Sequence, residues 1–323
     1  MNRGILVGAL AIAVLLLPFA TEAQQPGKVY RIGLLVNNRG PHLAALTRGL
    51  HELGYVEGRN ILVELRSAEG NSERLPELAG ALVRLRVDVL VAPDPPSTFA
   101  AKAATRTIPI VMRSSNDPVE MGLVSSLARP GGNITGVYSL YAELTPKRLE
   151  LLKEAIPGLA RVAVLWNPGW PGAVTVWRDT QVAAKALGLE LHSLEVRRRE
   201  ELEGAFRAAS AARAGALLTL RNPLLVVNRR QLAVLAAQTR LPVMYDERDF
   251  VDEGGLMSYG ANLDDLYRRT AAYVDKILKG ARPAEIAVEQ PTQFELVINM
   301  KTARALGIAI ARSVLLRADK VIE

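Results

Sequence analysis

Short apolar runs alternate with amphipathic helical stretches along most of this 323-residue chain, and they do so in two successive series. The first series runs from Tyr30–Val36 to a fourth apolar run at 108–112, and the second from Arg161–Trp166 to 242–245. A regular strand–helix alternation predicts parallel sheets, because a right-handed helical crossover returns the chain to a neighbouring parallel strand. The pattern therefore predicts an α/β protein with two doubly wound parallel-sheet lobes.

The chain is expected to pass between the two lobes more than once. Each combines two stretches: 28–140 with about 255–283, and 141–254 with about 284–323. The crossings are expected near Leu140, near Gly254 and between residues 281 and 286. A hinge needs only a few loop residues to absorb the backbone change, and the glycine pair at 254 and 255 suits this role. The sequence therefore predicts a hinged cleft that closes on a ligand.

The stretch 114–136 leads from one lobe toward the other. Its polar beginning, residues 114–117, suits a loop that faces a ligand. A short apolar helix is expected at 119–128, and the turn at 129–133 should end it, because proline lacks a donor and glycine accepts left-handed backbone. A strand at 134–140 should follow.

The N-terminus has the pattern of an export signal. Arg3 precedes the uncharged apolar run 5–17, Pro18 interrupts it, and 21–23 resembles a cleavage site. The alternative, an uncleaved anchor, needs roughly 20 apolar residues. The sequence therefore predicts a signal peptide, 1–23, and a periplasmic protein. With no cysteine, the mature chain has neither a disulfide nor a lipid-anchor cysteine.

The charge pattern indicates a mixed, solvated surface. The formal net charge is +7, but the arginines are scattered, and the run at 197–199 leads directly into two glutamates. Together with export, this argues against nucleic acid as a partner.

Recognisable catalytic motifs are missing. The chain has no nucleotide-binding loop, no dinucleotide fingerprint, no Gly-x-Ser-x-Gly elbow and no zinc-protease histidine pair. The histidines sit among polar neighbours, which favours surface or structural roles: His42, His51 and His192. The sequence therefore predicts a protein that is not an enzyme and uses no cofactor and no metal.

Candidate ligand-binding residues lie in six loops. In parallel α/β sheets, ligands bind beyond the carboxyl ends of the strands, near helix N-termini. In the first lobe these loops supply Asn38, Arg39, Asp94, Ser97, Thr98, Ser114, Ser115, Asn116 and Asp117. In the second lobe they supply Asn167, Trp170, Arg221, Asn222, Tyr245 and Asp246. The alternative is that Asn, Asp and Ser are simply favourable loop residues.

Two tryptophans could stack on a ring of the ligand. The large flat face of tryptophan adds contact area at little entropic cost. Trp166 ends a strand, which favours a place in the core. Trp170 lies between Gly169 and Pro171 and is the better cleft candidate.

The most specific hypothesis concerns Ser97 and Thr98. A helix beginning near Ser97 would point its free backbone donors and two hydroxyls at the cleft, which favours a carboxylate or another anion. Asp117 and Asp246 would then meet a cationic group such as an ammonium. The alternative is that Ser97 only caps its own helix.

Longer motifs resemble the TrpX-like ABC transporter substrate-binding family. They follow in order across the predicted mature chain: 54–60 (GYVEGRN), 117–119 (DPV), 122–136, 147–152 (KRLELL), 254–260 (GGLMSYG), 273–280 (YVDKILKG) and 289–292 (EQPT). The resemblance implies a type I periplasmic binding protein fold. It also implies a non-enzymatic protein that delivers a small solute, such as an aromatic amino acid or another carboxylate, to an ABC permease, and we expect the protein to be a monomer. The loop 93–96 departs from the family's usual small residues by being bulkier and more acidic.

Three other functions compete with uptake. A periplasmic sensor subunit for a signalling receptor would share the fold and the cleft. A secreted hydrolase is disfavoured because no nucleophile–base motif is present. A cytoplasmic repressor would need a DNA-binding helix-turn-helix at 1–23, where the export signal stands.

Overall fold

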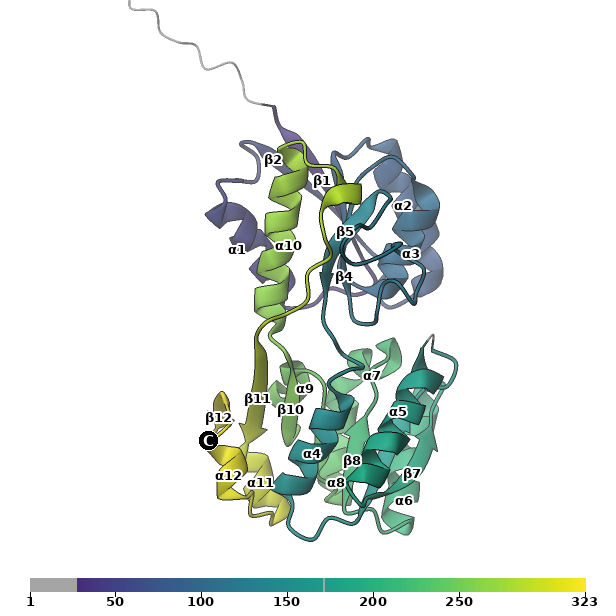
Figure 1. Cartoon of the computed structure of the whole chain (residues 1–323), viewed down its shortest axis with the longest axis vertical. Coiled ribbons are helices and arrows are strands. Elements are labelled where there is room, and N and C mark those ends of the chain that lie inside the picture. Colours follow the sequence, from purple (N-terminus) through teal and green to yellow (C-terminus); the bar gives the residue numbers. More distant parts are fainter. Residues whose placement is uncertain (1–27, 171) are drawn as a thin grey trace, which may run out of the picture.

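Two α/β lobes lie one above the other along the long axis of the computed structural model (Figure 1). The structure describes residues 28–170 and 172–323, so the predicted signal peptide lies outside the described residues. Within those ranges, no helix combines the length and the apolar character that crossing a bilayer requires.

The first lobe is a five-stranded parallel sheet with strand order β2-β1-β3-β4-β5. Its strands are β1 (Tyr30–Val36), β2 (Ile61–Ser67), β3 (Val89–Ala92), β4 (Ile110–Ser114) and β5 (Ile134–Tyr138). The apolar residues of both sheet faces are buried beneath helices, as the near-continuous apolar runs predict. One face is covered by α1 (Leu43–Glu52) and α10 (Leu263–Leu278), and the other by α2 (Leu75–Arg84) and α3 (Pro95–Ala104), with the 3₁₀ turn Ser72–Arg74 before α2.

The second lobe is a seven-stranded sheet with strand order β12-β11-β10-β9-β8-β6-β7. All its pairs are parallel except β10 with β11. Its strands are β6 (Arg161–Trp166), β7 (Glu190–Glu195), β8 (Ala216–Thr219), β9 (Val243–Tyr245), β10 (Met257–Ala261), β11 (Phe294–Asn299) and β12 (Lys320–Ile322). The prediction of two doubly wound lobes is confirmed.

Helices cover both faces of the second sheet as well. On one face lie α4 (Thr145–Ala155), α5 (Ala173–Ala186), α11 (Met300–Leu306) and α12 (Arg312–Leu315). On the other lie α6 (Leu202–Ala211), α7 (Pro223–Val227), α8 (Arg229–Thr239) and α9 (Arg248–Asp252), with the 3₁₀ turn Arg199–Glu201 before α6.

The chain crosses between the lobes at three places, and two differ from the sequence prediction. The first follows β5 near Leu140, as expected. The second is at Asn262 and not at Gly254, because β10 pairs with β9 and so belongs to the second lobe. The third follows Glu289, whose N–H donates to the carbonyl of Gly136 in β5. The first lobe therefore takes 262–289, and the predicted bounds 255 and 283 are wrong.

One predicted helix also differs from the structure. Residues 119–128 form turns instead of a helix, because Gly122 takes left-handed backbone with φ 65° and Leu123 N–H bonds back to Pro118. Farther along the chain, α7 and α8 are separate helices because Asn228 between them takes a non-helical conformation.

Arg148 of α4 joins two of the crossing segments. It is 1% exposed; its Nε donates to the carbonyl of Tyr259 at 2.7 Å, and its Nη1 to that of Tyr141 at 2.9 Å. The guanidinium also lies over the Tyr141 ring, 4.7 Å from its centroid. Burial lowers the pKa of Arg148 from its usual value. The contacts hold the start of the first crossing against the end of β10.

Candidate ligand-binding cleft between the lobes

A cavity of about 320 Å³ lies between the two lobes. The first lobe lines it with the loops after β1 and β3, the end of β4 and the start of α10. The second lobe lines it with Trp170 and the loops after β8 and β9. These loops are at the carboxyl ends of the strands, where ligands of parallel sheets bind. The volume lies in the range of small-molecule sites, about 300–1,000 Å³.

Several residues predicted from the sequence line this cavity. They are Asn38, Arg39, Asp94, Ser115, Trp170, Arg221 and Asn222. Trp166 lies in the core, as expected: it is 5% exposed and stacks on Trp177 with ring centroids 5.4 Å apart.

Other predicted residues lie outside the main cavity. Asn116 and Asn167 border a smaller hollow beside Trp166 and Trp170. The Ser114 hydroxyl donates to the backbone carbonyl of Asn116 at 2.6 Å.

The predicted acceptors for a cationic group, Asp117 and Asp246, are also absent from the lining. Asp117 accepts the N–H of Val119 at 2.7 Å and so closes a turn. Asp246 is 3% exposed and pairs with Arg221.

Tyr245, another predicted ligand-binding residue, also lies outside the cavity lining. It is fully buried against Phe250, with ring centroids 4.7 Å apart.

The prediction that Ser97 and Thr98 form an anion site is wrong, because α3 begins earlier, at Pro95, with Asp94 as its N-cap. Pro95 and Pro96 have no N–H to offer. Asp94 Oδ1 accepts the Ser97 N–H at 2.9 Å, and the Asp94 carbonyl accepts the Thr98 N–H at 3.0 Å.

Both side chains are also fully buried away from the cavity. The Thr98 hydroxyl lies 2.9 Å from the Asp94 carbonyl and 3.1 Å from that of Ala92, so it serves the backbone. Ser97 does not cap the helix either. An Asp followed by two prolines is an N-cap signature, and it could have been recognised in the sequence.

The second-lobe wall carries one buried arginine and two carboxylates. Arg221 Nη1 is 2.9 Å from Asp246 Oδ2 and also contacts the Glu247 carboxylate. Burial acts to lower the pKa of Arg221, but the two carboxylates outweigh it and hold that pKa above its usual value. The Glu247 carboxylate lines the cavity beside Arg221.

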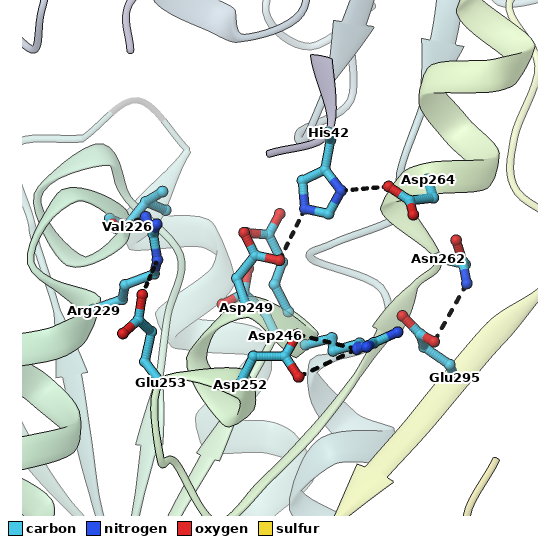
Figure 2. Close-up of polar contacts among 12 residues, drawn as sticks. His42, Val226, Arg229, Asp246, Asp249, Asp252, Glu253, Asn262, Asp264 and Glu295 are labelled. Carbon is cyan, nitrogen blue, oxygen red and sulfur yellow. Dashed lines mark hydrogen bonds and ion pairs between the residues drawn. The ribbon is translucent and has the colours of Figure 1, made fainter. Parts of the chain in front are cut away.

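His42, which precedes α1, is in contact with both lobes (Figure 2). Its Nδ1 is 2.8 Å from Asp264 Oδ1 on α10, and its Nε2 is 2.8 Å from Asp249 Oδ1 on α9. Burial acts to lower the pKa of His42, but the hydrogen bond and charge of Asp249, with help from Asp264, raise it overall. Asp249 has its pKa lowered: burial opposes this, and His42 prevails. This pair links first-lobe and second-lobe residues beside the cavity.

Arg113, at the end of β4, is a lining residue that the sequence prediction missed. It is 4% exposed, its Nε donates to the Pro93 carbonyl at 2.9 Å, and its Cζ lies 5.5 Å from the Tyr267 ring centroid. Its Nη1 is buried and makes no hydrogen bond to any described residue. The sequence feature that could have identified Arg113 is its position directly after the apolar run Ile110, Val111 and Met112.

Acidic and histidine side chains do not gather into a metal site in the described part of the chain. No group of three or more His, Cys, Asp or Glu residues there is arranged to hold an ion.

The model of the family described as ABC transporter substrate binding protein matches residues 40–322. The chain belongs to this family. Its members bind small-molecule ligands and work with an ABC permease, so the resemblance inferred from the motifs is confirmed. The family is one of solute-binding proteins, and the sensor and hydrolase alternatives are not favoured.

Individual relatives agree with this assignment. The substrate-binding protein is 27% identical over 261 residues to a protein named Tyrosine-binding protein from Clostridioides difficile (strain R20291), covering 81% of this chain and 75% of that protein. A conserved domain protein from Vibrio cholerae is 30% identical with a TM-score of 0.83, covering 91% of this chain and 100% of that chain. An ABC domain from Streptococcus pneumoniae in complex with L-Trp is 25% identical with a TM-score of 0.82, covering 91% and 99%.

Proposed function

We propose that this substrate-binding protein captures a zwitterionic amino acid, of the aromatic class, in the cleft between its lobes. The observation that carries the proposal is the polarity of the cavity. A buried arginine, Arg113, lines it from the first lobe, and the carboxylate of Glu247 lines it from the second. An amino acid carries one charge of each sign, so it can satisfy both walls.

The walls between these charges suit an aromatic side chain. Tyr267, Trp170, Val226 and the prolines of the 93–96 loop line the same cavity. Flat rings and aliphatic groups offer contact area to an aromatic ligand. The relatives named for tyrosine and solved with L-Trp support this class.

The protein acts in the periplasm as a monomer and hands its ligand to the permease unchanged. Support comes from the apolar run after Arg3 and from the lack of cysteine for a lipid anchor. N-terminal sequencing of the periplasmic protein should begin at or near Gln24. Retention of Met1 in a membrane fraction would contradict this placement.

The test of ligand class is a binding screen on the purified mature protein. The twenty L-amino acids are compared by thermal shift, and the best are measured by titration calorimetry. We expect L-tyrosine, L-tryptophan or L-phenylalanine to bind best, and mass spectrometry should recover the ligand unaltered. Binding of sugars in place of every amino acid, or chemical conversion of the ligand, would contradict the proposal.

A further inference from the structure

Arg113 differs from the other deeply buried arginine of the cleft in having no carboxylate partner. Arg221 is compensated by Asp246 and Glu247. Among the described residues, no carboxylate oxygen lies within 4.0 Å of the Arg113 nitrogens, although the side chain is 4% exposed. A buried charge without a partner is costly, and such groups are normally paired. The cavity that Arg113 lines is where a counter-charge can enter.

The guanidinium of Arg113 is held so that part of it stays available. Its Nε is used by the Pro93 carbonyl, and its plane is supported by the Tyr267 ring. A guanidinium has five N–H donors in a fixed fork, which matches the two oxygens of a carboxylate. Nη1 makes no hydrogen bond to any described residue, so donors remain.

A helix N-terminus often binds an anion through its free N–H groups, but the N-terminus of α3 does not offer them here. Asp94 and the two prolines after it occupy or remove the first donors of α3. The two oxygens of Asp94 accept the N–H groups of Ser97 and Asn37, at 2.9 and 3.0 Å. The negative end of a ligand therefore finds its donor at Arg113 and not at α3.

We infer that Arg113 anchors the carboxylate of the ligand and thereby sets its orientation in the cleft, with the ammonium toward Glu247. The inference rests on the proposed function, because it requires a ligand that carries a carboxylate. It assigns recognition of the anion to a single side chain of the first lobe.

The test combines a change in the ligand with a change in the protein. L-tyrosine and L-tryptophan are compared with L-tyrosinamide and L-tryptophanamide, in which a neutral amide replaces the carboxylate. Calorimetry is done on the wild type, Arg113→Gln and Arg113→Lys. We expect the wild type to prefer acid over amide by about 10- to 150-fold, the range for a charge-assisted hydrogen bond. Arg113→Gln should lose this preference, and Arg113→Lys should keep part of it.

A matched control separates charge from site. Like Arg113→Gln, Arg31→Gln removes one arginine charge from the first lobe. Arg31 lies near the amino end of β1, whereas the cavity lies at the carboxyl ends of the strands, and its Nη1 bonds to the carbonyl of Leu85 at 2.8 Å. This variant should bind like the wild type. Thermal unfolding of each variant reports whether it folds, and the ratio of acid to amide affinity remains measurable in a weakened protein.

The outcomes distinguish the two claims. If an amino acid binds but Arg113→Gln keeps the full preference for acid over amide, Arg113 is structural and the inference is overturned, while the proposed function stands. If none of these four ligands, nor any other amino acid, binds the wild type, the proposed function falls and the inference falls with it.

Discussion

The two walls of the cleft each contain a buried arginine, and the two arginines differ in their carboxylate partners. On the first-lobe wall, Arg113 is buried without a carboxylate within 4.0 Å among the described residues. On the second-lobe wall, Arg221 contacts two carboxylates, Asp246 and Glu247. Among the described residues, the buried arginine of the first wall has no carboxylate partner of its own, whereas the buried arginine of the second wall has two. The difference indicates that each lobe recognises one end of the ligand, so closing the lobes completes the site.

The largest effect should come from weakening the contacts of Arg148 where the chain crosses between the lobes. Arg148→Met removes the buried side chain that donates to the carbonyls of both Tyr141 and Tyr259. We expect a loss of about 3 kcal/mol in the free energy of unfolding, measured by urea denaturation. The surface variant Arg207→Met, which breaks an exposed pair with Glu203, should cost below about 1 kcal/mol. Equal effects of the two variants would contradict a special role for Arg148.

The contrast between the walls can be tested by removing the charge of Glu247 from the second wall. Glu247→Gln should weaken binding of L-tyrosine or L-tryptophan by about 10- to 150-fold, because the ammonium loses a charged acceptor. The deaminated analogue 3-(4-hydroxyphenyl)propionate should not bind the variant more weakly than the wild type. Asp252→Asn alters an exposed pair with Arg248 and serves as the control in calorimetry. Unchanged affinity of the amino acid for Glu247→Gln would refute the assignment of the ammonium to this wall.

A smaller effect is expected from the pair that links the walls, His42 and Asp249. Because the pKa of His42 is raised, its stabilising contribution is complete below the usual histidine pKa of about 6.5 and is lost as pH rises through the raised value. The pKa of Asp249 is lowered, so its contribution is lost only as pH falls through that low value. Binding should therefore weaken as pH rises from 6 to 8.5.

The variant His42→Gln isolates this pair. It can still donate a hydrogen bond to Asp249 but cannot carry the charge. We expect calorimetry to show about a 5-fold weaker affinity at pH 6, which corresponds to about 1 kcal/mol, and a flat pH profile. The other charged groups near the pair, Asp264, Glu247 and Arg229, are unchanged in it. A variant with the wild-type pH profile would show that another group titrates.

The smallest effect on affinity should come from Thr98→Val. The hydroxyl serves the carbonyls of Asp94 and Ala92, so we expect a loss of about 1 kcal/mol in unfolding free energy and unchanged ligand affinity. Urea denaturation and calorimetry measure the two quantities separately. A 10-fold loss of affinity would restore Thr98 as a ligand-binding residue.

The fold was predictable because its signals are local and repeated. Apolar strands and helical stripes such as Leu46 and Leu50 depend on spacing along the chain. The lobe boundaries were less predictable, because nothing within Met257–Ala261 tells which sheet accepts it. That depends on the register with β9, more than ten residues away.

The site was predictable as a set of loops but not as a set of roles. Asp94 lines the cavity, yet its carboxylate caps a helix. His42 bonds to residues 207 and 222 positions away, so spacing could not reveal its partners. Arg113 was overlooked because the strand was taken to end at Met112, whereas β4 continues to Ser114 and buries the arginine.

A crystal structure of the protein with the amino acid that binds best would test the two-wall account most directly. We expect a carboxylate oxygen of the ligand about 2.7–2.9 Å from a terminal nitrogen of Arg113, with the ammonium directed toward Glu247. A ligand bound in the reverse orientation, or with its carboxylate distant from Arg113, would contradict the account.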